Sequence, residues 1–496
     1  MENAPSAFQQ KLPEGVVAIL AHTGKSRSFL RDVPIQNVIR EGIGGCEISV
    51  RLTSYRALPL SCIENLQLKI DGEEIDPKLI QLVLNGVSYK VSDMENLSNA
   101  WWFILDAATV FVPRSRRLLA GKHRVDAKLV TVEPYITAGR FSFYNSDSRE
   151  LCVDDTYPVL PSTESMPDRK GLKLGVTFHS FTDEYVSYKW SLEDMFQLAG
   201  WLGGGVEIVG PAHQRGFPHL SDEFERTFKS AVERWGLTPT CYGTYSDPFM
   251  LKQRDLTPEE SVEYIVPQLK SASRLGFKIV RLQYYAHTIA ERLLPWAERL
   301  DLKMGYELHA PLAIESEVTQ ELIVQIKKYG SPRLGLIPDT SIFARDIPDF
   351  RVASIRNAGL SENILSRAIE LWKAGVSITQ ALKELQAIGL AKEHIATMEP
   401  IWGTLAQSDP KALATILPYV IHVHGKFYGM KNGDEPSIRF EEVIKELVEG
   451  GYDGWMSSEY EGPGDVDTFH LVREHQEMAR RYIGKYEITA GERGDK

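Results

Sequence analysis

The stretch Tyr306-Glu-Leu-His-Ala-Pro311 places an acid and an imidazole two residues apart. Side chains at that spacing on a β-strand point to the same face, so Glu307 and His309 would lie together. If the strand belongs to a parallel barrel, both would face the mouth where barrel enzymes carry out their chemistry. We interpret Glu307 as a metal ligand and His309 as a group that moves a proton. The alternative interpretation is a strand end whose polar side chains simply meet water.

Later segments carry similar side chains where an apolar run ends. Asp339 follows one such run, His422 and His424 end the next, and Glu459 ends the last. Because neighbouring strand ends of a barrel meet at one rim, these groups and Glu307 can converge on one point. Three carboxylates and one imidazole form an oxygen-rich site for a divalent metal, with Mn²⁺ as first choice and Mg²⁺ or Co²⁺ as alternatives. One acid at a strand end is usually solvated, but four ligands on successive strands favour a shared ion.

The seventh predicted strand leaves one assignment open. His422 and His424 face the same way, so the sequence alone does not decide which of them binds the metal. We prefer His424 because it lies nearer the C-terminal end, and His422 is then a candidate for substrate contact or proton transfer. Lys426 is a candidate for holding an oxyanion or a sugar hydroxyl, although a lysine just past a strand is often a solvated cap.

The part of the chain after residue 170 alternates apolar strands with polar-faced helices, which is typical of a parallel α/β fold. Eight strand candidates indicate a (β/α)8 TIM barrel. Ser191 with Asp194 and Thr257 with Glu260 are capping signals for the helices between them. Residues 361–390 are strongly helical and predict an inserted hairpin or lid. The strand candidates are Leu174–Phe178, Val206–Val209, Thr240–Thr244, Lys278–Leu282, Lys303–Leu308, Leu334–Ile337, Tyr419–Val423 and Gly454–Ser458.

The first third of the chain has a different pattern, made of short alternating runs such as Leu66–Ile70 and Arg124–Val130. Asp71-Gly72 and Asn85-Gly86 are turn signals between such runs, so this part predicts an all-β antiparallel sandwich. We divide the chain accordingly into four parts. They are a β-sandwich domain at 1–153, a linker at 154–170, a TIM-barrel domain at 171–486 and a flexible tail at 487–496.

Size and composition restrict the class of protein. The 496 residues exceed what one core usually supports, in agreement with two domains. With 56 basic and 67 acidic residues and a net charge of −11, we expect neither nucleic acid nor an anionic membrane as partner. The four cysteines form no C-x-x-C pair, and we find neither a secretory leader nor a long apolar run. We therefore expect a cytoplasmic protein.

Residues 171–465 resemble the xylose-isomerase-like sugar isomerases and epimerases. In that superfamily Glu, Asp, His and Glu on strands five to eight hold the metal, and here the matching residues are Glu307, Asp339, His424 and Glu459. In the ketose epimerases a histidine follows the strand-six Asp by three positions. That position is Ile342 here, which counts against simple epimerase chemistry.

A narrower resemblance is to the C-glycoside deglycosidases. The segments Tyr306–Pro311 and Ile421–Tyr428 resemble their catalytic subunit. Four segments of the first third resemble their small β-subunit, so the chain resembles a fusion of two subunits that are normally encoded separately. These segments are Arg31-Asp-Val33, Ser54-Tyr-Arg-Ala-Leu-Pro-Leu60, Ile70-Asp-Gly72 and Gly121-Lys-His-Arg-Val125.

The resemblance implies a lyase that acts on a small 3-oxo-glycoside, either a C-glycoside or an O-glycoside. The metal would polarise the C3 ketone, and His309 would remove the C2 proton so that the C1 substituent leaves by β-elimination. Protonated His422 or water would return a proton to the aglycone. The alternative function is a metal-dependent sugar isomerase or epimerase. We also expect the chain to form a homo-oligomer.

Overall fold

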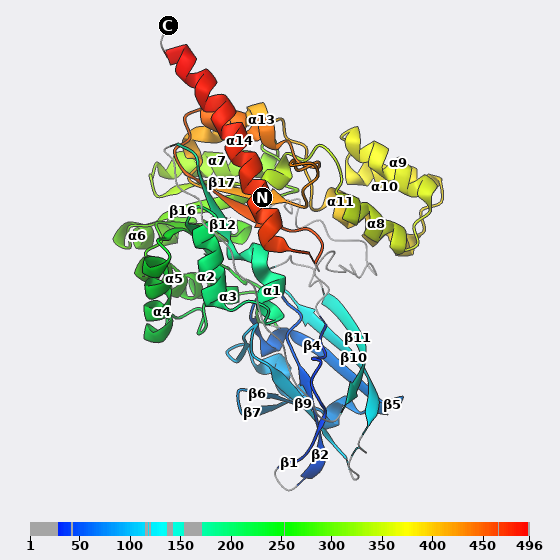
Figure 1. Cartoon of the computed structure of the whole chain (residues 1–496). Coiled ribbons are helices and arrows are strands. Elements are labelled where there is room, and N and C mark those ends of the chain that lie inside the picture. Colours follow the sequence, from blue (N-terminus) through cyan, green and yellow to red (C-terminus); the bar gives the residue numbers. More distant parts are fainter. Residues whose placement is uncertain are drawn as a thin grey trace.

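The computed structural model describes residues 28–40, 43–114, 118, 121–135, 142–152, 171–251, 253–464 and 466–494. The predicted linker at 154–170 therefore lies outside the described residues. Figure 1 shows an all-β part, coloured blue to cyan, packed beneath a larger part in which helices surround a central sheet. The predicted fold class, a sandwich followed by a (β/α)8 barrel, is confirmed.

The N-terminal part is built from two antiparallel sheets. One sheet has the strand order β1-β2-β9-β6-β7 and the other β11-β10-β4-β5, while β3 and β8 form a separate pair. The predicted turns join β4 to β5 at Asp71-Gly72 and β6 to β7 at Asn85-Gly86, all with positive φ as such hairpins require. The strands are β1 (Gln36–Arg40), β2 (Ile43–Val50), β3 (Leu58–Pro59), β4 (Ile63–Ile70), β5 (Glu73–Ile75), β6 (Gln81–Leu84), β7 (Val87–Lys90), β8 (Trp101–Trp102), β9 (Ala108–Pro113), β10 (Lys122–Val132) and β11 (Ser142–Cys152).

The sandwich core follows from alternation along these strands. Leu66, Leu68 and Ile70 of β4 are buried, while Gln67 and Lys69 between them are exposed. Apolar side chains of the other sheet, from β2, β6 and β9, complete the same core cluster. Strand β4 thus has one buried and one solvent-exposed face, as expected in packed antiparallel sheets.

The C-terminal part contains an all-parallel sheet of eight strands in the order β17-β16-β15-β14-β13-β12-β19-β18. Two single parallel bridges close the barrel between β17 and β18. They join Leu336 to Val420, just before β18, and Asp339, just after β17, to His424. The strands are β12 (Lys173–Thr177), β13 (Gly205–Val209), β14 (Thr238–Gly243), β15 (Ile279–Leu282), β16 (Lys303–Leu308), β17 (Leu334–Pro338), β18 (Val423–Phe427) and β19 (Trp455–Tyr460).

Helices cover the outside of this barrel (Figure 1). The predicted capping boxes at Ser191 and Thr257 are both present, and the predicted inserted hairpin is formed by α9 and α10. The final helix extends into the segment 487–496 that the sequence predicts to be a tail. The helices are α1 (Thr182–Val186), α2 (Leu192–Trp201), α3 (Gly210–His213), α4 (Asp222–Arg234), α5 (Pro258–Leu275), α6 (Ala290–Arg299), α7 (Glu317–Tyr329), α8 (Asp349–Asn357), α9 (Glu362–Lys373), α10 (Ile378–Ala387), α11 (Glu399–Trp402), α12 (Leu413–Ile416), α13 (Phe440–Glu449) and α14 (Thr468–Gly494).

The seventh barrel strand is the one whose predicted position is wrong. The sequence predicts Tyr419–Val423, whereas the strand runs from Val423 to Phe427. Residues Leu417–Tyr419 form a short 3-10 turn instead, with Pro418 inside it. The prediction followed the apolar run, but the true strand carries two ionisable side chains that face the barrel interior. Lys426 therefore lies within the strand and not just past it.

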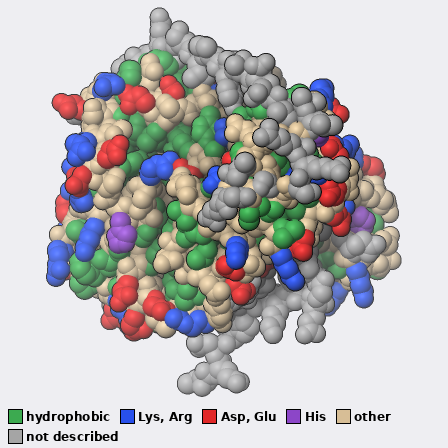
Figure 2. Space-filling model, turned by 90° about the horizontal axis from the view of Figure 1, so that it is seen from below, with side chains coloured by type: hydrophobic (Ala, Val, Ile, Leu, Met, Phe, Trp, Pro, Cys, Tyr) green, Lys and Arg blue, Asp and Glu red, His purple; other side chains and the backbone are tan. Residues whose placement is uncertain are grey.

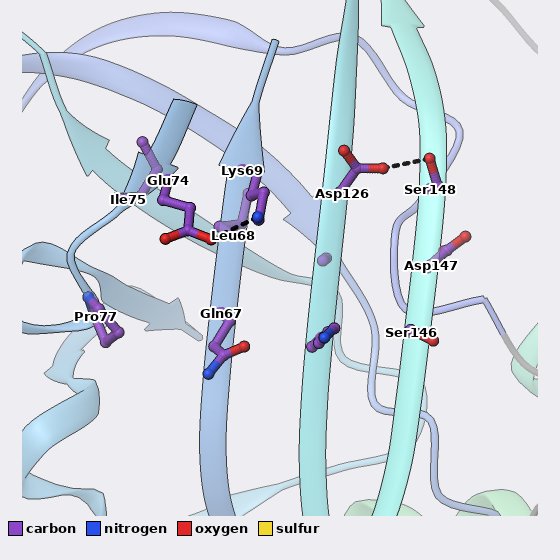
Figure 3. Close-up of a pocket in the computed structure, with 12 residues that line it drawn as sticks. Gln67, Leu68, Lys69, Glu74, Ile75, Pro77, Asp126, Ser146, Asp147 and Ser148 are labelled. Carbon is purple, nitrogen blue, oxygen red and sulfur yellow. Dashed lines mark hydrogen bonds and ion pairs between the residues drawn. The ribbon is translucent and has the colours of Figure 1, made fainter. Parts of the chain in front are cut away.

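The surface of the sandwich is mixed, with exposed apolar side chains such as Ile43, Leu79 and Val87 among the charged ones. Seen from below, acidic and basic side chains are interspersed over this end of the molecule (Figure 2). A shallow hollow of about 430 Å³ lies on the outer face of the four-stranded sheet, where Asp126 bonds to Ser148 (Figure 3). Sandwich residues alone line it, so it is separate from the predicted site. Among the described residues, we find no helix with the length and apolar character needed to cross a membrane.

Closure of the barrel depends on Gly335 of β17. A Cβ at this position would lie 2.5 Å from the carbonyl oxygen of Tyr419 and 2.7 Å from Ile421 Cγ2. Because a backbone atom cannot move aside as a flexible side chain can, we expect Gly335→Ala to destabilise the protein by about 1–3 kcal/mol. The matched control is Gly484→Ala within α14, which meets nothing within 4 Å and should stabilise by about 0.5–1 kcal/mol. Thermal unfolding of both variants checks this, and an unchanged midpoint for Gly335→Ala would contradict it.

Candidate metal centre

The four predicted ligands lie together at the C-terminal end of the barrel. Glu307 is near the end of β16, Asp339 follows β17, and His424 and Glu459 lie in β18 and β19. One ligand atom from each residue lies within 4.8 Å of the corresponding atoms of the other three. Three of the residues are buried and Glu307 is half-buried. Residues more than 150 positions apart therefore form one compact group, as barrel geometry predicts.

Strand register explains the convergence. His424 and Lys426 are two apart in β18, so both side chains point to the same face. In β19, Glu459 pairs with Lys426, and Asp339 forms the closing bridge with His424. The acids and the imidazole thus come from adjoining strand ends and need no long loop to meet.

The two nitrogens of His424 face different partners. Its Nδ1 lies 2.9 Å from Glu307 Oε1 and 3.5 Å from Glu459 Oε2. Its Nε2 lies 2.9 Å from Glu207 Oε1, on the other side of the ring. A histidine that binds a metal commonly donates its other N–H to a carboxylate, which fixes the ring and its tautomer. Nε2 is in ion-pair contact with Glu207 without a hydrogen bond of regular geometry, and Nδ1 is the nitrogen directed at the predicted ligands.

Glu207 is a residue of the site that the sequence predictions do not include. It is 1% exposed, and its Oε2 lies 3.0 Å from His422 Nε2. Burial alone would raise the pKa of Glu207, but interactions with His424 and His422 outweigh it and hold the pKa below its ordinary value. The sequence feature that points to Glu207 is its place as a lone acid inside the apolar run Gly205–Val209. A buried charge without a partner is costly, so such an acid is expected to have one.

His422 lies behind the predicted ligands. It is fully buried, and its Nε2 is 3.0 Å from both Glu207 Oε2 and Ser457 Oγ. Burial lowers its pKa below the ordinary value in spite of Glu207. The geometry therefore groups His424 with the three acids and places His422 on the far oxygen of Glu207.

Lys426 brings a buried positive charge to the acids. Its Nζ lies 3.0 Å from Asp339 Oδ2, 3.6 Å from Glu459 Oε2 and 3.0 Å from Glu461 Oε1. Burial opposes the charged form, but these three carboxylates raise the pKa of Lys426 well above its ordinary value. Two further groups of possible ligands are present among the described residues. One is Glu207 with His422 and His424, which is fully buried, and the other is His179 with Glu459 and Glu461, which adjoins this ammonium. Lys426 thus already supplies a cation at that position.

The donor set fits a divalent metal ion. Asp339 Oδ2 and Glu459 Oε2 are buried and accept no hydrogen bond, and both lie near the Lys426 ammonium, at 3.0 and 3.6 Å. A divalent ion bound here would share these two oxygens with that ammonium. Burial, together with Asp339 and Glu461, raises the pKa of Glu459 to about 8 although Lys426 and His424 oppose this. Carboxylate oxygens with one imidazole suit a hard ion and leave room for substrate oxygens.

His309 lies beside this group, just past the end of β16. Its Nδ1 is 2.6 Å from the carbonyl oxygen of Ala310, which can only accept a hydrogen bond. Nδ1 therefore carries the proton, and Nε2 has the basic lone pair. The ring is half-buried and close enough to Glu307 and Glu461 to act on both electrostatically.

Comparison with known proteins finds relatives of the N-terminal part. A family described as C-glycoside deglycosidase beta subunit matches residues 26–135. The 3'-dehydrocarminate deglycosidase beta subunit of Microbacterium sp is 33% identical over 129 residues, which cover 26% of this chain and 97% of the relative.

Larger matches are to alpha subunits. The 3'-dehydrocarminate deglycosidase alpha subunit of Microbacterium sp is 36% identical over 341 residues, covering 65% of this chain and 98% of the relative. The C-glycoside deglycosidase alpha subunit of Arthrobacter globiformis is 30% identical over 326 residues, which cover 63% of this chain and 93% of the relative. Among solved structures, an L-ribulose 3-epimerase is similar with a TM-score of 0.39 and 13% identity, covering 65% of this chain and 97% of that one.

Metal binding should be visible as stabilisation. An ion that binds only the folded state stabilises it by about 2.7 kcal/mol at a concentration 100 times its Kd. We therefore expect Mn²⁺ to raise the unfolding temperature of the metal-depleted protein, and Glu459→Gln to lose this effect because it lacks a charged ligand. The matched control, Glu442→Gln, changes an exposed acid of α13 and should behave like the unaltered protein. Undiminished Mn²⁺ binding by Glu459→Gln would contradict the ligand assignment.

Proposed function

The chain belongs to the C-glycoside deglycosidase family, and we propose that it is a metal-dependent lyase that cleaves the C1–aglycone bond of 3-oxo-glycosides. The observation that carries the proposal is the presence, in one polypeptide, of regions similar to both an alpha and a beta subunit. The convergence of Glu307, Asp339, His424 and Glu459 supports the metal-dependent part of it.

A ketone at C3 makes the hydrogen on C2 acidic, because the electron pair left at C2 is delocalised into the carbonyl. A divalent ion held by the four ligands would polarise that carbonyl and stabilise the charge of the enolate. The electrons then re-form the carbonyl and create a C1–C2 double bond. The bond from C1 to the aglycone breaks, and the aglycone leaves with the electron pair and takes one proton from water, while the base keeps the proton from C2.

We assign removal of the C2 proton to His309. Its Nδ1–H is held by the carbonyl of Ala310, so Nε2 is the nitrogen that accepts the proton. An imidazole is well suited to this task at neutral pH. The position of His309 beside Glu307, a predicted metal ligand, supports this assignment.

Lys426 and His422 have different parts in the proposal. Lys426 is a fixed positive charge among Asp339, Glu459 and Glu461, and we assign it to stabilising negative charge at the sugar. His422 is fully buried against Glu207, which supports a role in holding that carboxylate and not the predicted proton transfer. At the rim, half-buried His179 and Glu461 lie 3.4 Å apart and are the groups we assign to sugar hydroxyls.

The proposal is tested with a 3-oxo-C-glucoside and its O-linked counterpart, each incubated with the protein after metal depletion and after addition of Mn²⁺. Release of the aglycone only with metal supports the lyase. An isomerised sugar that keeps its aglycone would favour the alternative, a metal-dependent isomerase or epimerase. If both substrates stay unchanged, the proposal is refuted. The homo-oligomer and the identity of the metal remain predictions.

Loss of the base should separate turnover from metal binding. We expect His309→Ala to lower kcat by about 10²-fold or more, as for other general bases, with Mn²⁺ affinity kept. His470→Ala is the matched control, since this histidine is exposed on α14. Aglycone release measured by chromatography, together with metal titration, checks both statements. Unchanged turnover in His309→Ala would reassign the base.

A further inference from the structure

The connection between β2 and β3 of the sandwich reaches into the barrel. Arg56 of this connection is fully buried, and the backbone N–H of Ala57 donates to the carbonyl of Pro211 in the barrel at 3.0 Å. Tyr55 packs its ring edge-on against His179, with ring centres 5.5 Å apart. The sandwich therefore contributes side chains to the same end of the barrel as the metal centre, and does not merely cover its outside.

Arg56 makes a two-pronged ion pair with a barrel loop. Its Nη1 and Nη2 donate to the two oxygens of Asp247 at 2.6 and 2.5 Å, and Tyr264 Oη donates to the same carboxylate at 2.6 Å. Both charged side chains are fully buried. Asp247 has a φ of +38°, in the left-handed region that few residues adopt without support. The pair thus fixes the loop that follows β14.

The contact continues from this loop to a metal ligand. The Arg56 guanidinium carbon lies 4.2 Å from the centre of the Tyr245 ring, and that of Arg281 lies 5.2 Å from the same ring. Arg281 Nη1 is then 3.4 Å from Glu307 Oε2. A Cβ on Gly243 would lie 2.9 Å from Arg281 Nη2, so this guanidinium is closely packed on that side as well.

We propose that Arg56 of the sandwich is a positioning residue for the metal centre, acting through Tyr245 and Arg281 on Glu307. Arg281 pairs with one oxygen of Glu307, and the other oxygen lies 2.9 Å from His424 Nδ1. The inference rests on the proposed metal site. It gives the sandwich a function in metal binding, because Arg56 of the sandwich packs on the Tyr245 ring of the barrel.

The experiment compares Mn²⁺ affinity, by chelator competition, with thermal stability in three variants. Arg56→Met removes the guanidinium and leaves Asp247 buried without its partner. We expect the Kd for Mn²⁺ to rise about 10-fold or more, as for other groups that orient metal ligands. Arg215→Met is the matched control. Arg215 also forms an ion pair between barrel and sandwich, 2.7 Å from Asp106, but it is exposed and does not contact Tyr245 or Arg281.

A double variant separates positioning from stability. Arg56→Met with Asp247→Asn removes both charges, so most of the lost stability should return, since Asn tolerates the left-handed backbone. The proposal predicts that the Kd for Mn²⁺ stays raised, because the Tyr245 ring still lacks the guanidinium. Recovery of affinity in the double variant, or an equal loss in Arg215→Met, would overturn it. Because Mn²⁺ alone is the probe, a protein that binds the ion without lyase activity would refute the proposed function and leave this inference standing.

Discussion

Repulsion among clustered carboxylates limits how the C-terminal end of the barrel can be built. Glu307, Asp339, Glu459 and Glu461 meet at one end of the barrel, and two carboxylates about 4 Å apart repel by about 4 kcal/mol at the dielectric typical of protein sites. Among the described residues, Lys426 and Arg281 are the permanently charged cations paired with these acids. Four carboxylates against two permanent cations leave an excess of negative charge. The raised pKa of Glu459 relieves part of it, and a divalent ion would balance the rest.

The fold provides this arrangement in two steps. The parallel barrel brings side chains from β16 to β19 to a common rim, and Glu207 in β13 and His422, just before β18, support them from below. Glu207 is the central support, because its two oxygens hold His422 and His424 apart and fix the orientation of both rings. The sandwich adds the buried pair between Arg56 and Asp247. A buried ion pair is a poor source of stability, so its value lies in fixing positions.

Much of this arrangement could be predicted from the sequence, since alternation and strand ends are local signals. The order of the two parts, the barrel, its capping boxes and the four converging ligands all follow from such signals. The seventh strand was misplaced because its functional segment, Val423–Phe427, is less apolar than the run before it. The role of Arg56 could not be predicted, because its partner Asp247 lies 191 residues away and only tertiary packing joins them. The contact between Glu207 and His424 could not be predicted either, because it joins strands that meet only when the barrel closes.

Binding of one divalent ion at this rim can be tested by anomalous diffraction at the manganese absorption edge from crystals grown with Mn²⁺. We expect a single strong peak within bonding distance of one atom each from Glu307, Asp339, His424 and Glu459. A peak placed instead among Glu207, His422 and His424, or no peak at this end of the barrel, would contradict it.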